Sequence, residues 1–418
     1  MPPPLLQASY RVLRFWLREI WGPDWDGPRR RLLLKHYRGF LRNGDIPTEY
    51  FPDPETGAAA VQEAFSKAYR RKLAEVQQDA PPARGVHLTY RPIGKNLRLL
   101  GTALREGVDR HRRVYIEPGG PAIEERALAA RGHQWSPWLW VRNGSMPRGE
   151  AEEADAARAW NLLFRHPAPP EPGAVGKQSA RQDGRIRLAG KDPRFPASRQ
   201  RLEQVLKLAA ATRYVFTPAE PVAERIRELK AAMGWPGENT PVLGVHVRRG
   251  DAASTEADPR QATRRSFGLA SYLEAADRIC ARYGIGDLFL ATESPEEIDR
   301  ARRLRPQYRF FSLDYDRSLF PTIGSGRFIE DYTLDHPELA RALATSAVLD
   351  LALFCDCRGF VGAFNSEFSV LAWLLVIGSR GHLVPYLSLS RPAPGRSLHP
   401  FHALLNLRTN CPLELYHW

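Results

Sequence analysis

Two periods of hydrophobic and polar residues alternate along the second half of the chain. Short, nearly all-apolar runs recur there, as is typical of strands covered on both faces in a parallel sheet. These runs are "TPVLGVHV" (240–247), "DLFLAT" (287–292), "YRFFSL" (308–313), "GFVGAF" (359–364) and "HLVPYL" (382–387). Segments with helical spacing precede or separate them, at 218–235, 270–283, 294–305, 338–354 and from 366 onward. The alternation predicts an open α/β fold with right-handed crossovers.

The helix expected at 294–305 carries start signals of its own. Ser294 stands at the N-cap, Pro295 at the first helical position, and Glu297 at the position that closes a capping box. The sequence therefore predicts a well-defined helix start directly after the strand 287–292.

The first half of the chain is less regular. Helices broken by turns are expected over the first eighty residues, with one helix from about 59 to 78. A strand at 85–90, a turn at 91–96, a helix at 97–111 and a strand at 113–117 then form a βαβ pattern. Residues 143–205 are rich in proline, glycine and charge, and we expect loops or a mobile lid there.

The length of 418 residues favours two domains. We divide the chain into a helical region at 1–80, a Rossmann-like domain with long loops at 81–212, a second Rossmann-like domain at 213–392, and a tail at 393–418 that packs back.

The charge of the chain suits an anionic partner. Its 60 Lys and Arg residues against 47 Asp and Glu residues give a net charge of +13, which fits a partner with phosphate or carboxylate groups. We expect no nucleic acid, because no surface with interleaved aromatic residues is evident. Trp135, Trp138 and Trp140 are interpreted as core or sugar-stacking residues.

The four cysteines are too few for a disulfide-built fold and indicate a reducing compartment. Cys355 and Cys357 are expected to be buried thiols, with a metal site as the alternative. The most apolar segment, 367–378, is too short for a transmembrane segment. No signal pattern is evident at the N-terminus, so we expect a cytoplasmic protein, with peripheral membrane contact through an amphipathic helix at 1–22 as an open alternative.

Several candidate functional residues follow the strand 240–247. Arg248 and Arg249 follow it directly, at the carboxyl end where ligands bind in such sheets. Because consecutive side chains of a strand face opposite ways, only one arginine is expected to reach a ligand such as a phosphate. Asp251 can hold an arginine in place, and Glu256 can approach a substrate hydroxyl. The alternative is a purely structural ion-pair cluster of Arg248, Arg249 and Asp251.

A second constellation lies near the end of the α/β region. Asp350 interrupts an otherwise apolar helix, where an unpaired carboxylate would be costly. Asn365 and Ser366 stand at a strand-to-helix turn, and a helix N-terminus offers backbone N–H groups to a diphosphate.

These motifs resemble the donor-binding half of the α1,6-fucosyltransferases, the family of the core N-glycan enzyme and the rhizobial nodulation fucosyltransferase. The resemblance covers 213–378 and is carried by "HVRRGD" followed by "TEA", and by "FLATESP", "VLDLALF" and "FVGAFNSEFS" in the same order. "YVFTPAEPVAERI" also resembles the helix that leads into the first of these strands.

The resemblance implies a GT-B-type glycosyltransferase with two Rossmann-like domains, in which 213–392 binds GDP-fucose and 81–212 lies on the acceptor side. It implies inverting transfer of fucose to a glycan or oligosaccharide hydroxyl, α1,6-type linkage being favoured, without a metal or other cofactor. Arg248 would hold the β-phosphate, and His246 and Asp350 would contact the guanine. Ser366 with Asn365 would bind the diphosphate.

The resemblance also implies the remaining roles. Glu256 would be the general base, Asp251 would orient the loop of the donor site, and Arg249 would belong to the same donor site. The chain departs from the family at Ala252, where a lysine is expected, and at Glu367, where a glutamine is expected beside the diphosphate. The family's acidic pair is Glu293 and Ser294 here. Further candidates for contact with the donor are Gly94, Lys95, Asn96 and Tyr272.

Two other functions remain open at this stage. Asp314 and Asp316 follow a strand as in metal-dependent glycosyltransferases, and loss of activity with a chelator would favour that class. The charge also permits a protein that binds a nucleotide sugar or a nucleic acid without catalysis. "HPFH" (399–402) is interpreted as surface histidines, with a metal pair as the alternative.

Overall fold

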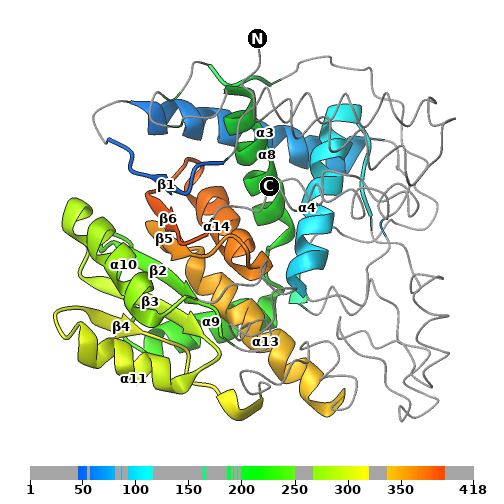
Figure 1. The fold of residues 1–418 in the computed structure, drawn as a ribbon. Coiled ribbons are helices and arrows are strands. Elements are labelled where there is room, and N and C mark those ends of the chain that lie inside the picture. The colour runs from blue at the N-terminus through cyan, green and yellow to red at the C-terminus, as the bar shows by residue number, and fades with distance from the viewer. Residues whose placement is uncertain are drawn as a thin grey trace, which may run out of the picture.

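Figure 1 shows the computed structural model of the chain, coloured from the N-terminus to the C-terminus. The structure describes residues 46–53, 57–80, 86, 93–115, 163–165, 186–189, 192, 195, 199–249, 267–319 and 337–390.

The described strands form one six-stranded sheet in the order β1-β6-β5-β2-β3-β4. They are β1 (Glu49–Tyr50), β2 (Val242–Val247), β3 (Asp287–Thr292), β4 (Arg309–Phe311), β5 (Gly359–Gly362) and β6 (Tyr386–Ser388). The strands β2 to β6 are mutually parallel, and β1 pairs with β6 in the antiparallel direction. The five strands predicted in the second half of the chain are confirmed, whereas β1 was not predicted.

The order of the parallel strands contains a reversal. From β2 the chain moves outward through β3 to β4, then crosses back over the sheet to β5 on the other side of β2 and continues to β6. The connection that follows β2 and the connection that follows β5 therefore lead to opposite sides of the sheet. In open α/β sheets, ligands bind at such a switch point, outside the carboxyl ends of the two strands.

Helices cover both faces of the sheet (Figure 1). One face packs on α10 (Leu269–Tyr283) and α11 (Pro295–Leu304). The other packs on α9 (Glu220–Ala232), α13 (Pro337–Phe354) and α14 (Glu367–Arg380). Each of these helices was predicted, and each boundary lies within a few residues of its expected place.

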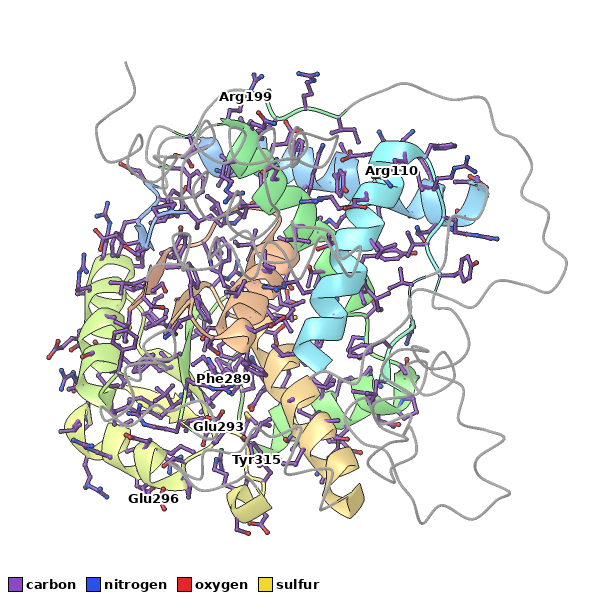
Figure 2. The ribbon with its side chains drawn as sticks, turned by 45° about the vertical axis from the view of Figure 1, so that its right-hand side comes forward. Arg110, Arg199, Phe289, Glu293, Glu296 and Tyr315 are labelled. Carbon is purple, nitrogen blue, oxygen red and sulfur yellow. The ribbon has the colours of Figure 1, made fainter. Side chains whose placement is uncertain are left out.

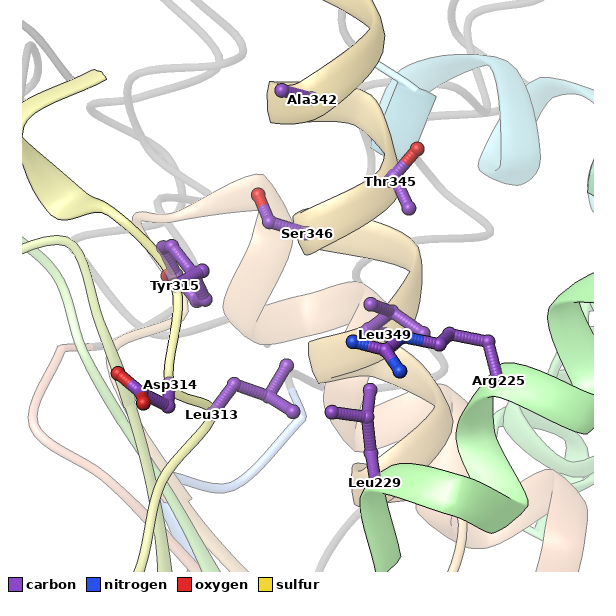
Figure 3. A pocket seen from close by; sticks show the side chains of 9 residues that line it. All are labelled: Arg225, Leu229, Leu313, Asp314, Tyr315, Ala342, Thr345, Ser346 and Leu349. Atoms are coloured by element: carbon purple, nitrogen blue, oxygen red, sulfur yellow. The ribbon is translucent and has the colours of Figure 1, made fainter.

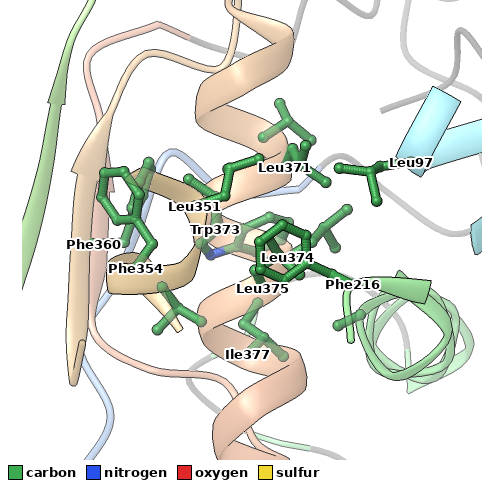
Figure 4. Packing of buried hydrophobic residues seen from close by; sticks show 14 of the residues in the cluster. Leu97, Phe216, Leu351, Phe354, Phe360, Leu371, Trp373, Leu374, Leu375 and Ile377 are labelled. Atoms are coloured by element: carbon green, nitrogen blue, oxygen red, sulfur yellow. The ribbon is translucent and has the colours of Figure 1, made fainter. Parts of the chain in front are cut away.

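A helical layer from the first half of the chain lies against α14. It consists of α3 (Ala58–Asp79), α4 (Ile93–Arg110) and α8 (Arg199–Val215), and α8 packs on the other two and on α14. Figure 4 shows Phe354 and Phe360 on one side of α14 and Leu97 and Phe216 on its other side. The core of the sheet therefore continues through α14 into this layer as one hydrophobic cluster.

The contact between α8 and α14 is unusually close. A Cβ on Gly378 of α14 would lie 2.3 Å from the Ala209 carbonyl oxygen of α8. The expectation of loops across 143–205 is wrong for its last part, because residues 199–205 form the start of α8. The boundary drawn between 212 and 213 falls inside this helix.

The βαβ pattern of the first half is partly visible. The N–H of Val86 donates to the Tyr115 carbonyl over 2.8 Å, where the two strands were expected. The helix between them begins at Ile93, so most of the turn expected at 91–96 is helical instead. Within the described ranges, no helix is long and apolar enough to cross a membrane.

Candidate functional site

Strand alternation separates the side chains at the end of β2. Val245 and Val247 pack on the face of α10, whereas His246 contacts α14 on the opposite face. Continued for two residues, the same alternation places Arg248 on the side of α14 and Arg249 on the side of α10 and α11. The contacts of Arg249 agree with this division.

Arg249 is buried in a network of structural contacts. Its Nε donates to Oε1 of Glu297 over 2.8 Å, and its Nη1 donates to the Phe267 carbonyl over 2.6 Å. Its backbone N–H donates to Oε2 of Glu293 over 3.1 Å. We infer that Arg249 supports the strand end, in part through Glu297, rather than reaching a ligand itself.

These contacts also correct the capping box expected for α11. Ser294 is the N-cap by backbone position, but its side chain accepts no backbone hydrogen bond. Its hydroxyl donates to Oε2 of Glu296 over 2.6 Å instead. Glu297 forms an ion pair with Arg249. Its carboxylate is therefore engaged by a residue far away in the chain instead of closing the capping box with Ser294.

Arg248 is the better placed of the two arginines for a ligand. Its side chain is 27% exposed, and its Nη1 lies 3.8 Å from Oε1 of Glu293. Tyr272 of α10 is buried beside the strand end, and burial raises the pKa of its hydroxyl to about 12. Tyr272 therefore supports this region as a neutral, packed ring.

His246 joins the carboxyl end of β2 to the first turn of α14. Its Nδ1 lies 2.6 Å from the Ser369 hydroxyl, and its ring centroid lies 4.7 Å from that of Phe368. Burial, with the nearby charge of Arg248, lowers the pKa of His246 to about 3. The imidazole is therefore neutral at physiological pH and can recognise a ligand by hydrogen bonding without carrying charge.

The turn between β5 and α14 is fixed by hydroxyl groups. Ser366 is buried at the N-cap, and its Oγ accepts from the backbone N–H of Ser369 over 3.5 Å. The backbone N–H of Asn365 donates to Oγ of Ser390 over 2.9 Å. Serine at this position is a favoured cap, so the predicted helix start at Ser366 is confirmed.

Asp350 is buried on α13 with 6% of its surface exposed. Burial raises the pKa of its carboxyl to about 7, although the nearby Arg317 favours the charged form. The Tyr315 hydroxyl lies 3.4 Å from its Oδ2. A buried carboxyl with so strongly raised a pKa is a candidate functional group.

Tyr315 and Arg317 belong to the site but were not predicted. Nε of Arg317 donates to the Thr292 carbonyl at the end of β3 over 3.2 Å, and its guanidinium stacks 4.3 Å above the Tyr315 ring. Figure 2 shows Glu293 and Tyr315 at one end of the molecule, away from Arg110 and Arg199. In the sequence, this segment was marked only by Asp314 and Asp316 of the metal alternative.

A pocket of about 460 Å³ lies beside this cluster, between α9, α13 and the segment after β4. In Figure 3, Leu229 and Leu313 point toward Leu349, and Tyr315 stands opposite Ser346. Ser346 precedes Asp350 by one turn of α13, and Tyr315 contacts that carboxylate. The pocket has a volume that suits a small ligand and lies next to the buried acid.

Of the two aspartates of the metal alternative, one lies at this pocket's edge. Asp314 is one of its lining residues. Oδ1 of Asp316 accepts from both the backbone N–H and the hydroxyl of Ser318, at 2.9 and 2.6 Å, and these bonds lower the pKa of its carboxyl. Across the part of the chain that the structure describes, no group of three or more His, Cys, Asp or Glu side chains is arranged to hold a metal ion.

Glu367 is the first residue of α14 and contacts the helical layer. Its Oε1 lies 3.4 Å from Nε of Arg98 on α4. No feature of the sequence pointed to Arg98, because the two residues are far apart along the chain.

Several predicted residues lie outside the described residues. These are Asp251, Ala252, Glu256, the three tryptophans at 135, 138 and 140, and the histidines of 399–402. Gly94, Lys95 and Asn96 lie in the first turn of α4, but the side chains of Lys95 and Asn96 are outside the described part. The predicted base therefore stays a prediction. Of the cysteines predicted to be buried thiols, Cys357 is buried and Cys355 is half-buried.

No protein-family model matches the chain. No curated protein matches it either. Among solved structures, the chain is similar to the fucosyltransferase NodZ from Bradyrhizobium, with 16% identity, a TM-score of 0.37, and coverage of 70% of this chain and 92% of that one. A structure of NodZ alpha-1,6-fucosyltransferase co-crystallised with GDP gives the same values. POFUT1 in complex with GDP-fucose is similar over 44% of this chain and 49% of its own, with 14% identity and a TM-score of 0.29.

Proposed function

We propose that this protein is a fucosyltransferase that transfers L-fucose from GDP-fucose to a hydroxyl of a glycan. The observation that carries the proposal is the convergence of His246, Arg248 and the capped start of α14 at the switch point between β2 and β5. The site thus offers a neutral hydrogen-bonding ring, a cation and a helix N-terminus at the place where this sheet topology binds nucleotides.

Asp350 and His246 form the guanine-binding part of the proposed site. An ionised Asp350 would accept hydrogen bonds from the N1–H and the 2-amino group of guanine, two donors that match one carboxylate. The free carboxylate is costly in its buried position, and the paired donors of the base would offset that cost. Recognition of guanine rather than adenine follows from this pairing.

Arg248 and α14 form the phosphate-binding part. Cleavage of the sugar–diphosphate bond builds negative charge on the GDP leaving group. A fixed guanidinium and the N–H groups at the start of α14, next to Ser366, would stabilise that charge as it develops. These groups supply from the protein what a bound Mg²⁺ supplies in other glycosyltransferases, so we propose a metal-independent reaction.

Glu256 is the proposed general base. It would take the proton of the acceptor hydroxyl while that oxygen forms a bond to the anomeric carbon of fucose. The bond from that carbon to the β-phosphate oxygen breaks, and its electron pair leaves with GDP. A single displacement of this kind inverts the anomeric centre.

We propose a GT-B arrangement in which the sheet domain binds the donor and residues 81–212 face a glycan or oligosaccharide acceptor, with α1,6-type linkage. We also retain the cytoplasmic location expected from the sequence. A site without catalysis would keep GDP binding but show no transfer with any acceptor.

Transfer is tested with radiolabelled GDP-fucose and a panel of N-glycan core, chitin-oligosaccharide and polysaccharide acceptors, with and without EDTA. Fucosylated product in both conditions supports the proposal. Product that disappears with EDTA and returns with Mn²⁺ would support the metal-dependent alternative at Asp314 and Asp316.

A further inference from the structure

The ion pair between Arg98 and Glu367 lies at the start of α14, where the proposed site binds the diphosphate. The guanidinium side chain is buried, with 9% exposed, whereas the carboxylate side chain is 37% exposed. The cation comes from α4 in the helical layer, and the anion comes from the nucleotide-binding side of the fold. The pair therefore joins the two parts of the molecule at the proposed donor site.

Glu367 poses an electrostatic problem for this site. A carboxylate in the first turn of a helix interacts favourably with the partial positive charge of that helix end. It therefore competes with any anionic ligand for the same N-terminus, and it repels a diphosphate directly. A site for GDP at the start of α14 therefore needs a cation that neutralises the charge of Glu367.

We propose that Arg98 supplies this cation. It is a positioning residue that neutralises Glu367 and so allows the diphosphate to bind at the start of α14. This inference rests on the proposed function. Arg98 would act through Glu367, holding the carboxylate on the side of α4 while the N–H groups of the helix remain available to the phosphate oxygens.

The packing around Arg98 holds its helix, α4, in a fixed position. Leu97 and Leu100, on either side of it in α4, are fully buried. A Cβ on Gly101 would lie 2.7 Å from the Thr212 hydroxyl of α8, so α4 and α8 approach closely. The guanidinium is therefore presented from a helix that cannot shift easily, and its position relative to α14 is set by the common packing on α8.

The inference is tested by calorimetric titration of wild type, Arg98→Gln, Glu367→Gln and the double variant with GDP and with guanosine. The matched control is Arg110→Gln, which removes the same charge from the exposed end of α4, where Arg110 pairs only loosely with Glu106 at 3.9 Å. Guanosine has the base and ribose of GDP but no phosphate, so it separates an effect on the diphosphate from a general loss of the fold.

We expect Arg98→Gln to weaken GDP binding at least tenfold and to leave guanosine binding within twofold of wild type. Glu367→Gln alone is expected to tighten GDP binding a few-fold, and the double variant should bind GDP within threefold of wild type, because no carboxylate then remains to be neutralised. Arg98→Lys, which keeps the charge, should retain most of the affinity.

Two results would overturn the inference while leaving the proposed function intact. One is GDP affinity in Arg98→Gln equal to that of wild type and of Arg110→Gln. The other is a double variant as weak as Arg98→Gln, which would mean that Arg98 does not act through Glu367. If wild type itself bound no GDP, the proposed function would fail first.

Discussion

His246 and Ser369 lie 2.6 Å apart, from Nδ1 to Oγ, across the switch point between β2 and β5. The contact ties the end of the first parallel strand to the first turn of α14. Because Ser366 caps the same turn, the base-recognition and phosphate-recognition parts of the proposed site share one rigid connection. A substitution in either part is therefore expected to alter ligand binding in the other part as well.

Replacing Asp350 with Asn should stabilise the free protein at high pH. The folded pKa of about 7 lies above the ordinary value of 3.8, so the folded state favours the protonated acid. The resulting stability is complete below the unfolded pKa and is lost as the pH rises through about 7, at a cost of about 4 kcal/mol. Thermal unfolding should show a higher Tm for Asp350→Asn than for wild type at pH 8 and little difference at pH 4. Equal Tm differences at both pH values would contradict the buried acid.

The same variant should lose base recognition. Wild type is expected to bind GDP at least tenfold more tightly than inosine diphosphate, which lacks the 2-amino group that Asp350 would accept from. In Asp350→Asn this preference should shrink to a few-fold. Competition titrations with the two nucleotides measure it, and an unchanged preference would place the guanine elsewhere.

The affinity for GDP should also depend on pH through Asp350. Since the carboxyl must be ionised to accept both guanine donors, binding should weaken as the pH falls below about 7, by up to tenfold per unit. His246 remains neutral over this range because its pKa is lowered to about 3. Because the terminal phosphate of GDP also titrates at about pH 6, the test uses guanosine, which has no phosphate. Titrations with guanosine from pH 5.5 to 8 should show the slope in wild type and none in Asp350→Asn.

Glu256→Gln should separate binding from transfer. The amide keeps the shape of the side chain but cannot take the acceptor proton, so the rate of fucose transfer should fall by about 10²–10⁴. GDP binding should be unchanged. Turnover at the wild-type rate would remove Glu256 from the chemistry and leave the base unassigned.

Gly378→Val should destabilise the fold through the contact between α8 and α14. Even its Cβ would lie 2.3 Å from the Ala209 carbonyl oxygen, a distance that forces the helices apart. We expect a loss of about 3 kcal/mol in the free energy of unfolding. The control is Gly237→Ala, whose Cβ meets no atom within 4 Å and should change stability by about 0.5 kcal/mol or less. If both variants unfolded at the same denaturant concentration, the close packing of α8 on α14 would be wrong.

The strands, their flanking helices and the division between Arg248 and Arg249 could be predicted because each depends on local periodicity. The helix α8 could not, because it starts within a proline- and glycine-rich stretch and its contact face includes the small residues Ala209, Ala210 and Ala211. The ion pairs of Glu297 and Arg98 could not be predicted either. Their partners lie far away in the chain, and only the packed fold brings the charges together.

Titration of wild type and Arg248→Ala with GDP, with and without EDTA, tests the central claim most directly. The control is Arg302→Ala, which removes one charge from an exposed position on α11. We predict micromolar GDP binding that is unaffected by EDTA, is retained in Arg302→Ala and is weakened at least a hundredfold in Arg248→Ala. Absence of binding in wild type, or binding that requires a metal, would contradict the assignment of a metal-independent GDP-sugar site.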